Sequence, residues 1–500
     1  MDFQIPSINL ELIAPVLIVL VGGVFTILVD LIAEIVADSP RFGSKYRKAW
    51  APWMAIITLS FALVWTVSMW GTTGGTFAPE GGEAMIVVDN YATFLNFIFL
   101  VTGILAVLIS AGFLRRFELN KPEYYMLMLI SIGGMMLMGM GNDLILIFLA
   151  LEILSIPLYI MSGFAWPRPE SEESAMKYFV LGAFSSAIFI FGVAIMYGAA
   201  GSTSLPAIYE NIDVTSPLAL TAVALMLVGF GFKVGAAPFH MWTPDVYEGA
   251  PTAVTAFMSV GAKVAGFAAL MRILVVALPD MADVWITAIA LISALTLLLG
   301  NTIAIAQQNI KRMLAYSSIA HAGFILIGVA AAAENSAGVG SALFYMLAYL
   351  FTNLGAFAVV IVLERKDGEG ALLDDYKGLS KRHTGLALVM AIMMLSLAGI
   401  PPTGGFIGKF YVFGAALDAG LGWLAIWGVL TSVISAFYYL RVVYLMFMFD
   451  GEGELTFEPG LKLVLAITAV VTFALGLFPT MWLDLASQAA LTTFQAFAGG

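Results

Sequence analysis

Four ionisable residues lie deep inside long apolar stretches of the sequence. Lys233, Lys263 and Lys409 each fall within such a stretch, and Glu152 lies halfway along FLALEILSIPLYI. A charge in the middle of a membrane costs at least about 2.5 kcal/mol, so each residue needs a partner or water. The alternatives are that each side chain extends to the membrane interface or forms a static ion pair. Glu152 is about ten residues, roughly 15 Å, from either helix end, which is too far to reach the interface. We therefore interpret these residues as proton carriers.

Lysine and glutamate are chemically suited to pass a proton inside a membrane. Desolvation favours the neutral amine of a buried lysine, whereas a nearby carboxylate favours the ammonium. If Glu152 lies close to Lys233 the ammonium is stabilised, and if the two separate, Lys233 tends to release its proton. Arginine stays charged in proteins and cannot do the same. The pattern predicts a Glu152–Lys233 pair followed by further lysine carriers.

Three further residues are weaker candidates for the same path. Lys177 begins the sixth apolar stretch, where it either modulates that pair or anchors a helix at the interface. His240 lies beside a Gly and Pro interruption and either shuttles protons from the cytoplasm to Lys233 or caps a helix. His321, in AYSSIAHAGF, either joins a water-lined link with the two serines of that motif or makes helix contacts. These three complete the set of candidate site residues.

The composition places these residues in a polytopic membrane protein. Of the 500 residues, 61% are hydrophobic and 11% are charged, and the mean hydropathy is +0.97, whereas soluble domains are near half apolar and a quarter charged. Apolar stretches of about 20 residues recur along the chain, each long enough to span a bilayer as a helix. The N-terminal stretch has no basic region before it, so we expect a retained span rather than a signal peptide. The net charge of −11 argues against nucleic acid as a partner.

The sequence offers no site for a redox centre or a metal ion. There is no cysteine, which excludes thiolate-held iron–sulfur clusters from this chain. The glycines of GFGFKVG lie within an apolar stretch and lack a following phosphate-binding helix. We therefore expect neither a cofactor nor a metal in the chain itself.

The apolar stretches predict an all-α fold of about fourteen transmembrane helices. The seventh and twelfth, residues 217–248 and 385–417, are longer than one helix needs and are interrupted by GAAPFH and GIPPTGG. Such interrupted segments in the two halves of a transporter predict discontinuous helices at binding sites. Because the two lie five helices apart and five is odd, we expect two inverted five-helix repeats. The expected helices cover residues 8–30, 50–70, 91–114, 124–141, 143–163, 175–198, 217–248, 251–274, 282–300, 313–333, 340–363, 385–417, 422–448 and 461–483.

Lysine and arginine in the connecting segments predict the orientation of the chain. They follow the odd-numbered helices, as in RFGSKYRK, whereas segments after even-numbered helices carry almost none, with Arg272 as the main exception. We expect the basic segments to be cytoplasmic and both termini to lie outside. The expected divisions are an N-terminal three-helix segment, a first repeat, a second inverted repeat, and a C-terminal helix with its tail, at residues 1–123, 124–274, 282–448 and 449–500.

Three long motifs resemble one protein family. FKVGAAPFHMWTPDVYEGAPTAVTAF, NIKRMLAYSSIAHAGF and LSLAGIPPTGGFIGKFYVF, in this order, resemble the antiporter-like membrane subunits of bacterial respiratory complex I, the NADH–quinone oxidoreductase. These subunits are related to those of Mrp-type cation/proton antiporters, and the resemblance covers nearly the whole chain. By position in the motifs it implies Glu152 and Lys233 as the glutamate–lysine pair, Lys263 as the central lysine, Lys409 as the terminal lysine and Lys177 as the additional lysine of the sixth helix.

The resemblance also implies partners and a division of labour. The chain would carry protons in a bacterial inner membrane beside the membrane subunits M, K, A, J, H and L, while FMN, iron–sulfur clusters and quinone act elsewhere in the complex. Lys409 argues against subunit M, which tends to have a glutamate in the twelfth helix, and the chain end soon after the last helix argues against subunit L. A subunit of an Mrp-type antiporter or of a membrane-bound hydrogenase is the alternative, with the same path and a different driving reaction. A structural scaffold is a third.

Overall fold

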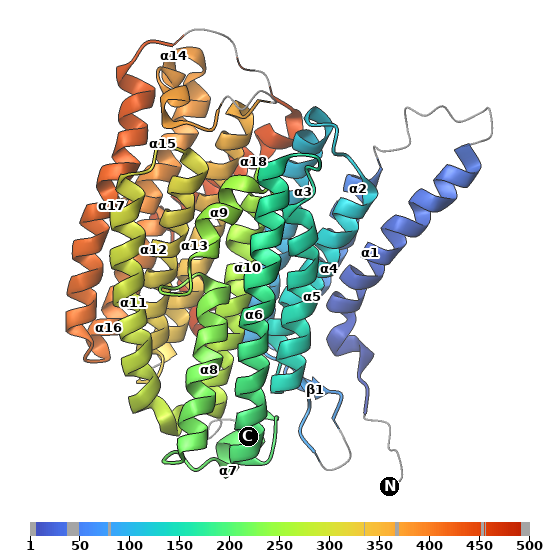
Figure 1. Cartoon of the computed structure of the whole chain (residues 1–500), viewed down its shortest axis with the longest axis vertical. Helices are drawn as coiled ribbons and strands as arrows, with labels where there is room; N and C mark the ends of the chain where they lie inside the picture. Colours follow the sequence, from blue (N-terminus) through green and yellow to red (C-terminus); the bar gives the residue numbers. More distant parts are fainter. Residues whose placement is uncertain are drawn as a thin grey trace.

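The computed structural model describes residues 7–37, 50–78, 82–334, 336–365, 370–451, 455 and 457–491. Within these ranges the chain forms a bundle of long helices, and α1 (Leu10–Ala37) leans away from the others at one end (Figure 1). The cations of RFGSKYRK, which carry part of the orientation argument, lie outside the described residues.

The described elements are α-helical apart from one short hairpin and a few tight turns. β1 (Gly74–Thr76) and β2 (Ile86–Val88) pair antiparallel, with Gly74 opposite Val88. The other elements are α2 (Ala51–Ser68), α3 (Asn90–Arg116), α4 (Pro122–Met140), α5 (Leu144–Ser162), α6 (Pro169–Ala200), α7 (Leu205–Asn211), α8 (Pro217–Val234), α9 (Trp242–Gly249), α10 (Thr252–Arg272), a π-helical turn η2 (Ile273–Ala277), a 3-10 turn η3 (Pro279–Met281), α11 (Ala282–Ile305), α12 (Ile310–Ala331), α13 (Ser336–Leu363), a 3-10 turn η4 (Leu373–Tyr376), α14 (Leu379–Arg382), α15 (Thr384–Ala398), α16 (Gly404–Asp418), α17 (Gly422–Met448), α18 (Pro459–Leu477) and α19 (Thr480–Gln488).

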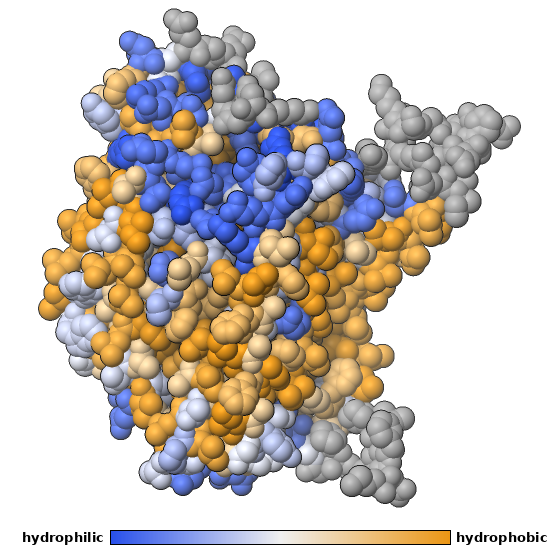
Figure 2. All heavy atoms as spheres, in the orientation of Figure 1, coloured by the Kyte–Doolittle hydropathy of each residue, from blue (hydrophilic) through white to orange (hydrophobic). Residues whose placement is uncertain are grey.

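Thirteen helices of the described residues are long and apolar enough to cross a membrane. They follow the expected helices in order, except that the expected helix at 385–417 is divided into α15 and α16, each shorter than a span. Figure 2 shows apolar side chains over the middle of the bundle and hydrophilic ones gathered toward its upper end. The prediction of an all-α, multi-pass membrane protein is therefore confirmed.

Both overlong segments contain a helix end followed by a new helix. α8 ends at Val234, where Gly235 follows with a φ of +74°, and α15 ends at Ala398, where Gly399 follows with a φ of +83°. Positive φ at this position commonly ends a helix and is tolerated by glycine, which has no Cβ. The prolines that come next lack a backbone N–H, so the same helix does not resume. α9 and α16 then begin after short connecting segments.

Three central helices are enclosed by the rest of the bundle. Every residue of α10 is buried, as is α13 from Gly338 to Leu363, and nearly all of α12 is buried as well. These helices carry Lys263 and His321. A polar side chain on them must find its hydrogen-bond partners inside the bundle, because neither lipid headgroups nor bulk water reach it.

Arg272, the exception to the pattern of basic segments, is an interior residue. It ends α10, is buried, and forms a bidentate pair with Asp89 through bonds of 2.8 and 3.0 Å. Its guanidinium also donates to the carbonyl of Gly139 and lies 4.9 Å from the ring centroid of Tyr91. Arg272 therefore joins α10 to α3 and α4, which explains why it does not follow the loop pattern.

Asp89→Asn is expected to destabilise the fold, because it leaves the buried Arg272 guanidinium without its carboxylate. Breaking a buried ion pair in this way costs about 3 kcal/mol or more. Glu458→Gln is the matched control, since the Arg115–Glu458 pair is 59% and 40% exposed and such pairs contribute about 0–1 kcal/mol. The midpoint of thermal unfolding of the purified protein in detergent measures both. Equal shifts for the two variants would contradict a structural role for the Arg272 pair.

Candidate functional site

Three of the predicted carriers are lysines buried on three different helices. Lys233 on α8, Lys263 on α10 and Lys409 on α16 are 5%, 3% and 4% exposed. None of the three forms an ion pair with a carboxylate of the described residues; each ammonium is held by hydroxyl or carbonyl oxygens instead. A buried ammonium with only neutral partners is more costly than one in an ion pair.

Lys233 is bonded to a serine that stands beside the predicted glutamate. Its Nζ donates to Ser155 Oγ over 2.7 Å, and Ser155 in turn donates to the carbonyl of Leu151. Glu152, three residues before Ser155 on α5, accepts a bond of 2.5 Å from Ser186 on α6. Glu152 and Lys233 thus approach the same stretch of α5, with no ion pair between them among the described residues. Residues three apart share a helix face, so the spacing from Glu152 is the signal that could have identified Ser155.

Lys233 and Lys263 are brought together by a glycine on α10. Gly266 lies three residues after Lys263, and a Cβ placed there would be 3.2 Å from Cγ of Lys233 and 3.0 Å from Val234. The stem of Lys233 therefore passes over α10 one turn away from Lys263. The absence of a side chain at Gly266 is what allows this close approach.

Lys263 depends on one residue of α12 for its hydrogen bonds. Its Nζ donates to Ser318 Oγ over 2.6 Å and also to the Ser318 carbonyl. A carbonyl oxygen has two lone pairs, so the Ser318 carbonyl can accept this bond as well as the bond from its own helix. Ser318 is one of the two serines expected near His321, and the structure instead assigns it to Lys263.

His321 lies between two tyrosines that the sequence did not single out. Its Nδ1 is 2.7 Å from the hydroxyl of Tyr345 on α13, and its Nε2 is 3.1 Å from the hydroxyl of Tyr439 on α17. The Tyr439 hydroxyl also contacts Ser317 Oγ, and the ring of Tyr349 lies 5.1 Å from the imidazole. No sequence spacing relates α12, α13 and α17, so this arrangement could not be found from the chain alone.

Lys409 is held at the end of α15 by main-chain oxygens. Its Nζ donates to the carbonyls of Leu397 and Ala398, both over 3.0 Å, and to Ser432 Oγ over 2.8 Å. The last carbonyls of a helix lack partners within it and carry partial negative charge, which favours a cation. The ammonium also lies 4.5 Å from the centroid of the Phe324 ring. The break after Ala398 thus creates the site that Lys409 occupies.

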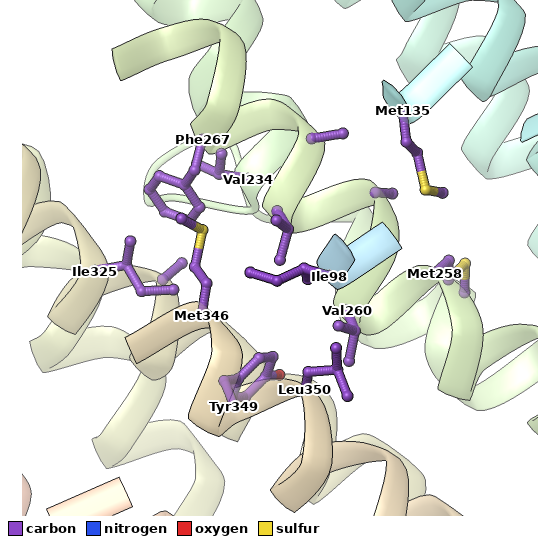
Figure 3. Close-up of a cluster of buried hydrophobic side chains, with 14 of the residues drawn as sticks. Ile98, Met135, Val234, Met258, Val260, Phe267, Ile325, Met346, Tyr349 and Leu350 are labelled. Carbon is purple, nitrogen blue, oxygen red and sulfur yellow. The ribbon is translucent and has the colours of Figure 1, made fainter. Parts of the chain in front are cut away.

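Apolar side chains from several helices pack near these sites. Figure 3 shows a cluster of them that includes Val234, Val260, Phe267 and Met346, and Val234 directly follows Lys233 in the sequence. Val260 and Phe267 lie one turn on either side of Lys263 along α10. A small cavity lined by His321, Tyr345 and Leu397, among others, has a volume of about 10 Å³, room for about one water molecule.

The two remaining candidates lie near α9. Lys177 pairs with Glu173 and Asp245, both over 2.7 Å, so its ion-pair partners are these residues rather than Glu152. Asp245 pairs as well with Arg312 on α12 over 2.8 Å, which ties α9 to α6 and α12. His240 lies in the segment between α8 and α9, and its buried Nδ1 has no partner among the described residues. Within the described ranges no group of three or more His, Asp or Glu side chains could hold a metal ion.

Comparisons with known proteins place the whole chain in one family. The family described as NADH:quinone oxidoreductase/Mrp antiporter, transmembrane, matches residues 141–435. A protein of Chloroflexus aggregans named NADH-quinone oxidoreductase subunit N is 47% identical over 486 residues, 96% of each chain. A protein of the same name from Trichlorobacter lovleyi is 44% identical over 490 residues, 97% of each chain.

A solved structure agrees with the sequence relatives. A chain in the respiratory complex I of Thermus thermophilus with bound aureothin is 33% identical, with a TM-score of 0.78 that covers 95% of this chain and 99% of that one. All seven candidate site residues fall within the matched residues 141–435. The resemblance inferred from the three sequence motifs is therefore confirmed. The chain belongs to the NADH:quinone oxidoreductase/Mrp antiporter transmembrane family, among the relatives named NADH-quinone oxidoreductase subunit N.

Proposed function

We propose that the chain is the proton-translocating, antiporter-like membrane subunit of a bacterial NADH–quinone oxidoreductase. The observation that carries this proposal is the set of three buried lysines on separate helices, each bonded to neutral oxygens. A lysine kept for structure is expected to pair with a carboxylate, as Arg272 does. Burial disfavours the charged form of a lysine, and a nearby carboxylate offsets that effect. An ammonium without such a partner therefore gives up its proton more readily.

The proposed path starts on the cytoplasmic side and ends outside. Protons enter beside His240 at the interruption after α8, reach Lys233, and pass through Lys263 and His321 to Lys409. Glu152 stabilises the charged form of Lys233 until the proton passes to Lys263. Val260 and Phe267, one turn on either side of Lys263 along α10, are apolar and fully buried, so we propose that each transfer needs transient wetting or a side-chain movement. We propose that both termini lie on the periplasmic side, because the basic segments follow the odd-numbered helices of the sequence.

The proposal includes the internal repeat and the divisions at residues 1–123, 124–274, 282–448 and 449–500. The helix breaks after Val234 and Ala398 support this part of the proposal, because each would fall in the fourth helix of its five-helix unit. Lys177 acts by holding Asp245, and so α9, near this path.

The redox reaction is assigned to other subunits. The chain has no cysteine, and we propose that FMN, iron–sulfur clusters and quinone act elsewhere in the complex. The proposed neighbours of this chain are the membrane subunits K, A, J, H, M and L. An affinity tag on this chain tests the proposal: we expect flavin and iron–sulfur absorbance and NADH-dependent quinone reduction in the purified complex. Co-purification with cation-antiporter subunits alone would instead support the Mrp alternative.

Glu152→Gln is expected to slow proton pumping without stopping it. The variant keeps the bond from Ser186 but removes the charge that stabilises the Lys233 ammonium. A loss of about 1.4 kcal/mol corresponds to about tenfold in rate. Pumping by the assembled complex in vesicles measures the effect, and Glu210→Gln, at an exposed acid, is the control. Equal rates for the two variants would remove Glu152 from the path.

Gly266→Ala is expected to impair pumping although alanine favours a helix by about 1 kcal/mol over glycine. The added Cβ would lie 3.2 Å from Cγ of Lys233 and push its ammonium away from Ser155. We expect a loss of about 1 kcal/mol of hydrogen bonding, hence roughly fivefold in rate. Gly261→Ala is the control on the same helix, because its Cβ meets only the flexible end of Met135 and a ring edge. A Gly266→Ala variant that pumps like Gly261→Ala would show that the close approach is not needed.

A further inference from the structure

Both ring nitrogens of His321 are occupied by tyrosine hydroxyls from different helices. Nδ1 lies 2.7 Å from the hydroxyl of Tyr345, and Nε2 lies 3.1 Å from that of Tyr439. All three side chains are buried. A neutral imidazole carries one N–H donor and one acceptor nitrogen. One tyrosine must therefore donate to the ring while the other accepts from it.

We propose that Tyr439, His321 and Tyr345 form a proton-transfer chain that joins the Lys263 side of the interior to the Lys409 side. This inference rests on the proposed function and adds two tyrosines to it, one on each side of the imidazole. The three residues come from α17, α12 and α13, so the chain exists only where these helices meet.

The Tyr439 end of the chain lies next to the partner of Lys263. The Tyr439 hydroxyl contacts Ser317 Oγ, and Ser317 is followed directly by Ser318, which accepts from the Lys263 ammonium. Lys263 and Tyr439 are therefore hydrogen-bonded to adjacent residues of α12. The Ser318 hydroxyl is therefore the side-chain group to which a proton leaving Lys263 first has access among the described residues.

The Tyr345 end lies next to the surroundings of Lys409. The ring of Tyr345 stacks on Phe324, with centroids 6.3 Å apart, and the Lys409 ammonium lies 4.5 Å from the centroid of the same Phe324 ring. The cavity that holds about one water molecule is lined by both Tyr345 and Leu397, and the Leu397 carbonyl accepts from Lys409. A water there would connect the Tyr345 hydroxyl to the Lys409 site.

Each transfer through the chain conserves protons and moves no electrons between groups. A proton arrives at the Tyr439 oxygen, whose own hydroxyl proton passes to Nε2 of His321. The proton on Nδ1 passes to the Tyr345 oxygen, and the hydroxyl proton of Tyr345 leaves to the cavity water. One proton enters and one leaves, each tyrosine stays neutral, and the histidine changes from its Nδ1–H to its Nε2–H tautomer. Rotation of the hydroxyls and return of the tautomer reset the chain.

Tyr439→Phe and Tyr345→Phe test the proposal, because each keeps the ring and removes one hydroxyl. In the assembled complex reconstituted in vesicles, we expect each to lower NADH-driven pumping at least about tenfold, as loss of a positioned proton-transfer group does. We also expect a larger ratio of the rates in H₂O and D₂O, since proton transfer becomes slower than other steps. Tyr124→Phe is the matched control, because it also removes a buried, hydrogen-bonded hydroxyl: Tyr124 lies on α4 and contacts Ser110 over 3.0 Å, outside the candidate site.

The outcomes separate this inference from the function on which it rests. If both variants pump like Tyr124→Phe while Lys263→Met does not pump, the lysine path stands and the tyrosine chain is wrong. If Lys263→Met pumps normally as well, the proposed function fails with it. A loss of pumping with an unchanged H₂O to D₂O ratio would also overturn the chain, because a packing defect acts on all steps alike. Should Tyr439→Phe fail to assemble, Tyr345→Phe carries the same test at the other ring nitrogen.

Discussion

Lys263→Met is expected to abolish proton pumping while the complex still assembles. Methionine is close to lysine in length and fills the same space on the fully buried α10, so the packing of the central helices is kept. Ser318 is the only hydrogen-bond partner of this ammonium among the described residues, and no carboxylate stands by to replace it. Loss of a positioned proton-transfer group costs about 10²- to 10⁴-fold in rate.

Vesicles that contain the assembled complex, a pH-sensitive dye and an added quinone measure this prediction. Quinone reduction reports assembly of the redox arm, and acidification of the vesicle interior reports pumping. Lys377→Met is the control, because Lys377 is a 39% exposed lysine paired with Asp374 outside the bundle's centre. Near-normal pumping and quinone reduction in Lys263→Met would disprove the lysine relay.

Lys409→Met and Lys409→Arg are both expected to stop pumping, and the second variant is the more informative. The carbonyls of Leu397 and Ala398 carry a partial negative charge at the end of α15, which favours a lysine or an arginine cation. Arginine restores that charge but does not release its proton in a protein. A proton carrier at this position therefore fails in both variants, by about 10²-fold or more.

A static role for Lys409 makes the opposite prediction. If the ammonium only caps α15, arginine restores the cap, and Lys409→Arg pumps normally while Lys409→Met is destabilised by about 1 kcal/mol, a typical value for a cation near a helix end. Pumping rates and the midpoint of thermal unfolding, measured on the same two preparations, decide between the roles. Normal pumping by Lys409→Arg would remove Lys409 from the proton path.

Much of the fold was predictable because membrane constraints act locally along the chain. A span needs about 20 apolar residues whatever it packs against, and thirteen of the expected helices appear in the described residues. The interruptions at GAAPFH and GIPPTGG were visible because glycine and proline act on their own backbone. The hairpin of β1 and β2 and the short helices α7 and α19 were not predicted, since each is too short to give the signal of a membrane span.

The candidate site was likewise predictable only in part from the sequence. The sequence alone singled out Glu152, Lys233, Lys263 and Lys409, because the cost of a charge in lipid does not depend on its neighbours. It also named His321 and Lys177, but it left open what each of them contacts.

Only the tertiary structure decided the partners of these residues. Ser155, Tyr345, Tyr439 and Ser432 come from helices far apart in the sequence, and helix rotation and close approach at Gly266 determine which of them meet. A hydrogen bond needs its two atoms within about 3 Å, and no spacing along a chain fixes that distance between separate helices. The sequence therefore determined where charge is buried in this protein, and packing determined which neutral oxygens hold it.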